Sequence, residues 1–108
     1  MANDILAFER EIIQLVQDSL ADHIEDFRRL NVTVHVPKIR RTKEGVPDYE
    51  SEICVDFSDN HGVFDVIEFF VYQRGKPTVQ QQEIKNWLAD AVADVVAQRQ
   101  AQLANQTP

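Results

Sequence analysis

The stretch SDNHGVFDVIEFFVYQRGK, residues 58–76, determines how this chain folds. It opens with Asp59, Asn60 and Gly62, residue types that favour a tight turn, and continues with β-branched and aromatic residues. A hairpin turn and then a strand at 63–74 are therefore expected. Large apolar residues occur at odd and even positions alike, so both faces of this strand are apolar. A strand in a small antiparallel sheet usually has one polar face.

The turn decides which residues of the hairpin lie opposite each other. Residues 49–58, YESEICVDFS, form the preceding strand, and a three-residue loop with Gly62 in the left-handed conformation pairs Asp59 with Val63. The helix-facing pairs that follow from this register are Val55 with Ile67, Ile53 with Phe69, and Ser51 with Val71. A four-residue loop would move the side chains of the second strand of the hairpin to the opposite faces.

Either register leaves a row of large apolar side chains on the sheet face away from the helices. With the three-residue loop, the row lies beside Cys54 and consists of Phe64, Val66, Phe70 and Tyr72. With the four-residue loop, it consists of Val63, Ile67, Phe69 and Val71. Such a row is at the upper end of what lone monomers expose. We expect a partner or dimer interface there, most simply a homodimer, with a helix over that face or a foreign partner as alternatives.

Helical patterns flank the strands. Residues 3–30 carry apolar residues at every third or fourth position, which predicts an amphipathic helix. An unbroken helix of that length would measure about 40 Å, more than a domain diameter of about 26 Å, so it projects, kinks or packs along a partner. Thr78 and Gln81 form a capping box for a second helix, which has Trp87 in its apolar stripe.

The remaining segments complete an α+β fold. Residues 31–41, NVTVHVPKIRR, alternate in polarity and predict the first strand, with Pro37 at an edge or a bulge, and 42–48 is a loop. The order is α-β-β-β-α, a three-stranded antiparallel meander with two long helices packed on one face. We expect a single domain over residues 1–104 and a disordered tail at 105–108.

Composition limits the classes of function. The 108 residues are 44% hydrophobic and 27% charged, as in ordinary globular proteins. Eighteen acidic and eleven basic residues give a net charge of -7, which disfavours nucleic-acid phosphates and suits a partner with a basic surface. No signal sequence and no apolar run approaching ~18 residues is present, so a cytoplasmic protein without membrane contact is expected.

One basic run, PKIRRTK, offers an anion or nucleic-acid contact through Lys38, Arg40, Arg41 and Lys43. The alternative, favoured by the acidity of the rest of the chain, is that these charges protect a strand edge from pairing. The element order is similar to that of double-stranded RNA-binding domains, whose last helix begins with several lysines. Residues 75–87 contain only Lys76 and Lys85, so the chain is not assigned to that family and nucleic-acid binding is not expected.

No residue pattern predicts catalysis, a metal or a cofactor. His61 stands among turn residues, and His35 and His23 lack the paired spacing of a metal site. Cys54 is the only cysteine, which excludes a disulfide within the chain and a cysteine-based zinc site. No neighbour in sequence would lower the pKa of its thiol. The protein is therefore not expected to be an enzyme.

These observations lead to one functional expectation and one alternative. The first is a small acidic, non-enzymatic protein-interaction module of the adaptor or immunity-like kind that acts as a homodimer. The alternative is a small-molecule binding protein, with a pocket between sheet and helices that is lined by Phe27, Phe57, Phe69 and Trp87.

Overall fold

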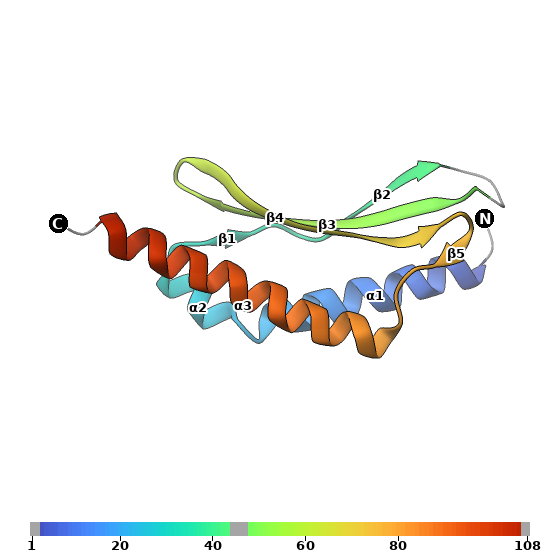
Figure 1. The fold of residues 1–108 in the computed structure, drawn as a ribbon, viewed down its shortest axis with the longest axis horizontal. Coiled ribbons are helices and arrows are strands. Elements are labelled where there is room, and N and C mark those ends of the chain that lie inside the picture. Colours follow the sequence, from blue (N-terminus) through green and yellow to red (C-terminus); the bar gives the residue numbers. More distant parts are fainter. Residues whose placement is uncertain (1–2, 44–47, 107–108) are drawn as a thin grey trace.

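The structure is a computed structural model that describes residues 3–43 and 48–106. All three helices lie on one face of a curled antiparallel sheet, which confirms the predicted α+β fold class (Figure 1). The molecule is elongated, with extents of 55 × 25 × 16 Å. In chain order the elements are α1 (Asn3–Ala21), α2 (Ile24–Arg29), β1 (Thr33–Val34), β2 (Lys38–Lys43), β3 (Glu50–Asp59), β4 (Gly62–Gln73), β5 (Lys76–Pro77) and α3 (Gln81–Gln106).

The first helical segment is divided in two. In the turn between α1 and α2, the backbone N–H of His23 donates to the carbonyl of Leu20 at 3.1 Å. The break turns Phe27 of α2 toward the sheet, where its ring centroid lies 5.7 Å from that of Phe57. Of the three alternatives for a helix longer than the domain, a kink is observed. Within the described ranges, none of the helices has the length and apolar character needed to cross a membrane.

The sheet is built around β3. β1 and β2 pair one after the other with the same edge of β3, and Pro37 lies between them, as expected of a residue that cannot donate to a ladder. β4 pairs with the other edge of β3. β5 adds only to the end of β4, opposite Tyr72 and Gln73. Among the described residues, β4 therefore has no strand partner on its second side from residue 62 to 71.

The centre of the hairpin has the predicted register and its ends do not. The confirmed pairs are Val55 with Ile67 and Ile53 with Phe69. At the ends, Asp59 lies opposite Gly62 rather than Val63, and Ser51 lies opposite Tyr72 rather than Val71. The register shifts between Phe57 and Ser58 and again between Ser51 and Glu52, so β-bulges cause both differences. Gly62 has the expected positive φ, +119°.

The two bulges turn Phe64 and Tyr72 toward the helices, so the prediction that they lie on the outer face is wrong. The Tyr72 ring is 5.8 Å from that of Phe8 and 5.7 Å from that of Tyr49, and the residue is 6% exposed. Phe64 packs against the core, with the guanidinium of Arg99 5.2 Å from its ring centroid. The members of the predicted row that stay on the outer face are Val66 and Phe70.

The second long helix, α3, begins at Gln81 and packs beside α1 (Figure 1). The predicted capping box is wrong, because the hydroxyl and N–H of Thr78 donate to the carbonyls of Phe70 and Val71 in β4. α3 continues through Gln106, into the segment expected to be a tail, and residues 107–108 of that tail lie outside the described residues. Residues 44–47 of the predicted loop also lie outside them.

Candidate functional site

The second side of β4 is an open strand edge. The N–H of Val66 donates to the carboxylate of Asp65 at 2.9 Å, and the carbonyl of Phe70 accepts from the Thr78 hydroxyl, so both groups point away from β3. Because backbone groups alternate in direction along a strand, those of Val66, Glu68 and Phe70 face the open edge. An edge of this kind is a template for pairing with another strand.

Helix α3 lies beneath this edge and runs antiparallel to β4 (Figure 1). Two contacts align the elements: Phe64 with Arg99, at 5.2 Å, and Phe69 with Trp87, whose ring centroids are 5.3 Å apart. Phe64 to Phe69 is about 17 Å along a strand, and Trp87 to Arg99 is about 18 Å along a helix. The two elements therefore stay side by side, and we call the strip of surface along residues 64–70 and 83–99, which is hollowed at one end, the β4–α3 groove.

One end of the β4–α3 groove is hollowed. The hollow measures about 320 Å³ and is lined by Phe69, Thr78, Val79, Glu83, Ile84 and Trp87. Trp87 is 42% exposed, so the prediction that it is a core residue is wrong. A large aromatic side chain beside a hollow is the kind of anchor that carries binding energy in protein interfaces.

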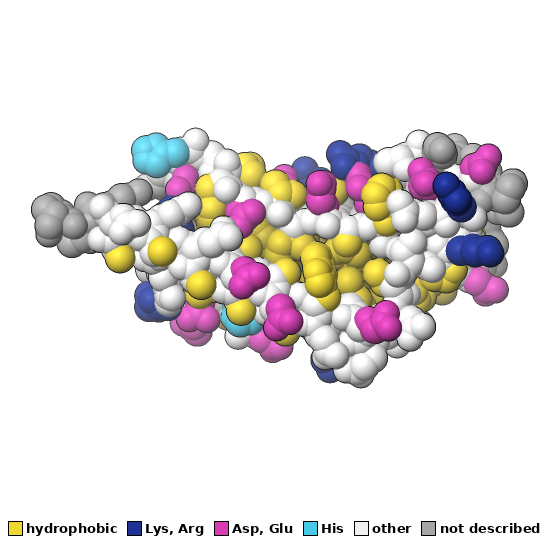
Figure 2. All heavy atoms as spheres, in the orientation of Figure 1, with side chains coloured by type: hydrophobic (Ala, Val, Ile, Leu, Met, Phe, Trp, Pro, Cys, Tyr) yellow, Lys and Arg dark blue, Asp and Glu magenta, His cyan; other side chains and the backbone are white. Residues whose placement is uncertain are grey.

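Acidic side chains border the groove. Glu83, Asp90 and Asp94 are exposed and lie on the same side of α3 as Trp87, because residues at i, i+4, i+7 and i+11 share one side of a helix. Figure 2 shows the result: hydrophobic side chains form a strip across the middle of this face, and Asp and Glu side chains lie above and below it. The groove combines an apolar floor with negative borders.

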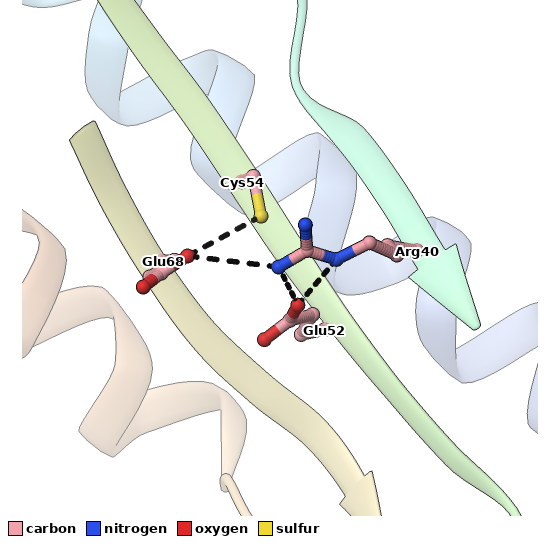
Figure 3. Close-up of polar contacts among 4 residues, drawn as sticks. All are labelled: Arg40, Glu52, Cys54 and Glu68. Atoms are coloured by element: carbon pink, nitrogen blue, oxygen red, sulfur yellow. Dashed lines mark hydrogen bonds and ion pairs between the residues drawn. The ribbon is translucent and has the colours of Figure 1, made fainter. Parts of the chain in front are cut away.

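A second cluster, on the outer face of the sheet, consists of Arg40, Glu52, Cys54 and Glu68 (Figure 3). Arg40 donates to Glu52, and its guanidinium lies 3.8 Å from Glu68. Potential metal-ligand atoms of Glu52, Cys54 and Glu68 lie within 4.8 Å of one another, but Arg40 already pairs with both carboxylates. Burial raises the pKa of the Cys54 thiol, which disfavours the thiolate that metal binding or nucleophilic attack requires. This cluster is an ion-pair network that holds β2, β3 and β4 together.

Glu9 of α1 is a buried carboxylate that the sequence analysis missed. It is 2% exposed, and its Oε1 and Oε2 accept from Arg41 at 3.0 Å and from the Tyr49 hydroxyl at 2.6 Å. Burial raises the pKa of Tyr49, so the hydroxyl remains a donor. The burial of Glu9 could have been predicted from the sequence, because Glu9 stands four residues after Ile5 and three before Ile12, within the apolar stripe of the helix. These bonds attach α1 to β2 and to Tyr49, the residue before β3.

The basic run does not form one anion-binding surface. Alternation along β2 places Arg40 on the outer face, in the ion-pair network, and Arg41 on the inner side, against Glu9. Lys38 is exposed, and the side chain of Lys43 lies outside the described part of the structure.

The predicted ligand pocket is occupied by two ring pairs. Phe27 packs on Phe57, at 5.7 Å, and Phe69 packs on Trp87, at 5.3 Å, so the four rings do not enclose one cavity. A separate hollow of about 470 Å³ lies between the end of α1, α2 and β1. Its lining includes Leu20, Ala21, Ile24, Phe27, Val32 and Val34, together with Arg28 and His35.

The three histidines are at separate places. His61 is exposed in the hairpin turn, where its N–H donates to Asp59 at 2.8 Å. His35 lies 2.9 Å from the Ser58 hydroxyl, and His23 is near Asp26. Within the described residues, the one group of His, Cys, Asp and Glu side chains close enough to hold a metal contains none of them.

Comparison with known proteins identifies no relative: no family model matches the chain, and neither a curated protein nor a solved structure matches it.

Proposed function

We propose that this protein is a small acidic, non-enzymatic protein-interaction module that binds through the edge of β4. The observation that carries the proposal is the open edge itself, where backbone groups of Val66 and Glu68 face away from β3 near the exposed Trp87. The open stretch ends at Phe70, whose carbonyl already accepts from the Thr78 hydroxyl. A strand added to such an edge gains main-chain hydrogen bonds, and neighbouring hollows supply side-chain specificity. The net charge of -7 favours approach of a basic partner.

A homodimer through the same edge is the alternative to a foreign partner. Two copies related by a two-fold axis would pair their β4 edges antiparallel and continue one sheet across both subunits. Val66 and Phe70, which face outward beside the edge, would then lie near the junction.

The test compares Val66→Pro with the wild type. Because the Val66 N–H points away from β3, proline there removes no bond of the β3–β4 ladder but prevents an incoming strand from pairing. Val36→Asp is the control, since Val36 is 73% exposed and lies at the opposite edge. We expect Val66→Pro to lose self-association, measured by light scattering, or partner capture, and Val36→Asp to keep both.

Phe70→Asp provides a second variant for the same test. It places a charge on the outer face beside the edge, so it should disperse an assembly through the sheet while the far-ultraviolet circular dichroism stays native. A wild-type protein that remains a strict monomer at micromolar concentration, and whose partner capture is unaffected by Val66→Pro, would end the proposal.

A second candidate function is binding of a small anionic amphiphile in the hollow between α1, α2 and β1. Its volume of about 470 Å³ falls within the usual range of small-molecule sites. The apolar lining suits an aliphatic chain, and a carboxylate could reach His35 and Arg28, whose present partner is the exposed Glu25 at 3.1 Å. Octanoate should raise the melting temperature of the wild type and have no effect on Ala21→Trp, which fills the hollow. Equal shifts in both proteins would remove this candidate.

A further inference from the structure

We infer that the β4–α3 groove takes an extended segment of another protein, with one apolar anchor residue and basic residues two and four positions away from it. The inference rests on the proposed function, since it uses the same open edge of β4. It goes further by identifying the chemistry of the occupant from the order of side chains along α3.

The spacing along α3 gives the pattern. A strand paired with β4 would direct every second side chain toward α3, about 6.8 Å apart. From Trp87, Asp90 lies about 4.5 Å and Asp94 about 10.5 Å further along the helix. If one inward side chain enters the hollow beside Phe69 and Trp87, the next two inward positions lie about 6.8 and 13.6 Å further on, within about 3 Å of the levels of Asp90 and Asp94, a gap that a long basic side chain spans. An apolar residue would therefore fit the hollow, and a basic residue at each of the next two inward positions would face Asp90 and Asp94.

The charges argue against a second copy as the occupant. In a two-fold pair, each β4–α3 groove would bring its own Glu83, Asp90 and Asp94 toward the same set in the other copy, and each chain has a net charge of -7. The two cations of α3 do not offset them. Arg99 is bonded to Asp59 at 2.9 Å, and Lys85 is two residues from Trp87, which places it on another side of α3.

The experiment uses the full chain and a synthetic peptide. The peptide TKTKTFTKTKT is palindromic, so it presents the anchor and the basic positions in both strand directions. Its counterpart TETETFTETET reverses the charge. Trp87 is the sole tryptophan and lines the groove, so a blue shift of its emission reports occupation directly. We expect saturable binding of the lysine peptide and none of the glutamate peptide.

Two matched charge variants locate the site. Asp90→Lys/Asp94→Lys should weaken binding of the lysine peptide by about tenfold or more, since it replaces two attractions by repulsions. Asp18→Lys/Asp22→Lys makes the same charge change on exposed residues at the end of α1 and should alter affinity by less than about threefold. Val66→Pro should abolish binding. Far-ultraviolet circular dichroism of each variant confirms that it is folded.

Three results would overturn the inference. If the lysine peptide fails to bind while the wild type forms a dimer that Val66→Pro disrupts, the occupant is a second copy and the proposed function stands. If the peptide fails to bind and no association depends on the edge, both proposals fall. If both charge variants weaken binding equally, the peptide is attracted by the overall negative charge of the protein and does not bind specifically in the groove.

Discussion

Replacing Arg41 by methionine should destabilise the fold more than its position on a surface strand suggests. Glu9 is 2% exposed, and Arg41 and Tyr49 are the groups that donate to its carboxylate. Removing one partner of a fully buried ion pair costs about 3–5 kcal/mol. The Arg41 side chain is 32% exposed and Tyr49 still donates, so we expect a loss of about 2–3 kcal/mol for Arg41→Met.

The double variant separates a buried charge from a lost packing contact. Glu9→Leu alone leaves Arg41 bonded to the Tyr49 hydroxyl and reaching solvent, and should cost about 1 kcal/mol, chiefly because the buried Tyr49 O–H loses its acceptor. Glu9→Leu/Arg41→Met removes both charges and fills the space with apolar groups, so it should lie within about 1 kcal/mol of the wild type. The two changes are therefore expected to be coupled by about 2 kcal/mol.

Urea denaturation followed by circular dichroism measures these differences, with Lys38→Met as the control. Lys38 is on the same strand and exposed, and its replacement should change the free energy of unfolding by less than about 0.5 kcal/mol. The reasoning is refuted if Arg41→Met is as stable as Lys38→Met, or if the effects of Glu9→Leu and Arg41→Met simply add.

Three further predictions concern other parts of the chain. Val95→Asp should abolish the native circular dichroism at 25 °C, because Val95 is 3% exposed and the charge would have no partner; a folded variant would contradict this. The pKa of Asp59 is lowered because the His61 N–H and Arg99 donate to it. Its stabilisation is therefore present above the ordinary pKa of 3.8 and lost as the pH falls through the lowered value. Asp59→Asn should thus lower the urea midpoint at neutral pH and flatten its fall below about pH 4; an unchanged pH profile would contradict this. Burial raises the pKa of the Cys54 thiol, so its alkylation rate should have a midpoint above pH 9.0, and a plateau below about pH 8 would be inconsistent with the structure.

Strong periodicity made most of the fold predictable. Ile53, Val55 and Phe57 alternate with polar residues, and the register that buries them also buries Ile67. The helices were predictable in the same way, because their apolar residues recur at every third or fourth position instead of every second. These patterns involve residues that are close together in the chain, so they can be recognised in a single sequence.

The bulges could not be predicted, because the sequence pattern is the same with and without them. Phe64 faces inward because α3 supplies Arg99 to cover its ring, and Tyr72 does so because Phe8 and Tyr49 surround it. These contacts join residues far apart in the chain, and the gain in burial outweighs an interrupted ladder. A prediction based on turn length alone does not include them.

The two edges of the sheet differ in a way that supports a role for β4. The edge formed by β1 and β2 is interrupted by Pro37 and carries Lys38 and Arg40, which are features that prevent strand pairing. Residues 62–71 of β4 contain neither proline nor a basic residue, and the Val66 N–H is occupied only by its neighbour Asp65, an acceptor that an incoming carbonyl can replace. An edge that is left open beside an apolar hollow, while the other edge is protected, supports the proposal that a strand binds there. The same asymmetry explains why Val66→Pro, harmless to the β3–β4 ladder, is the substitution best suited to test it.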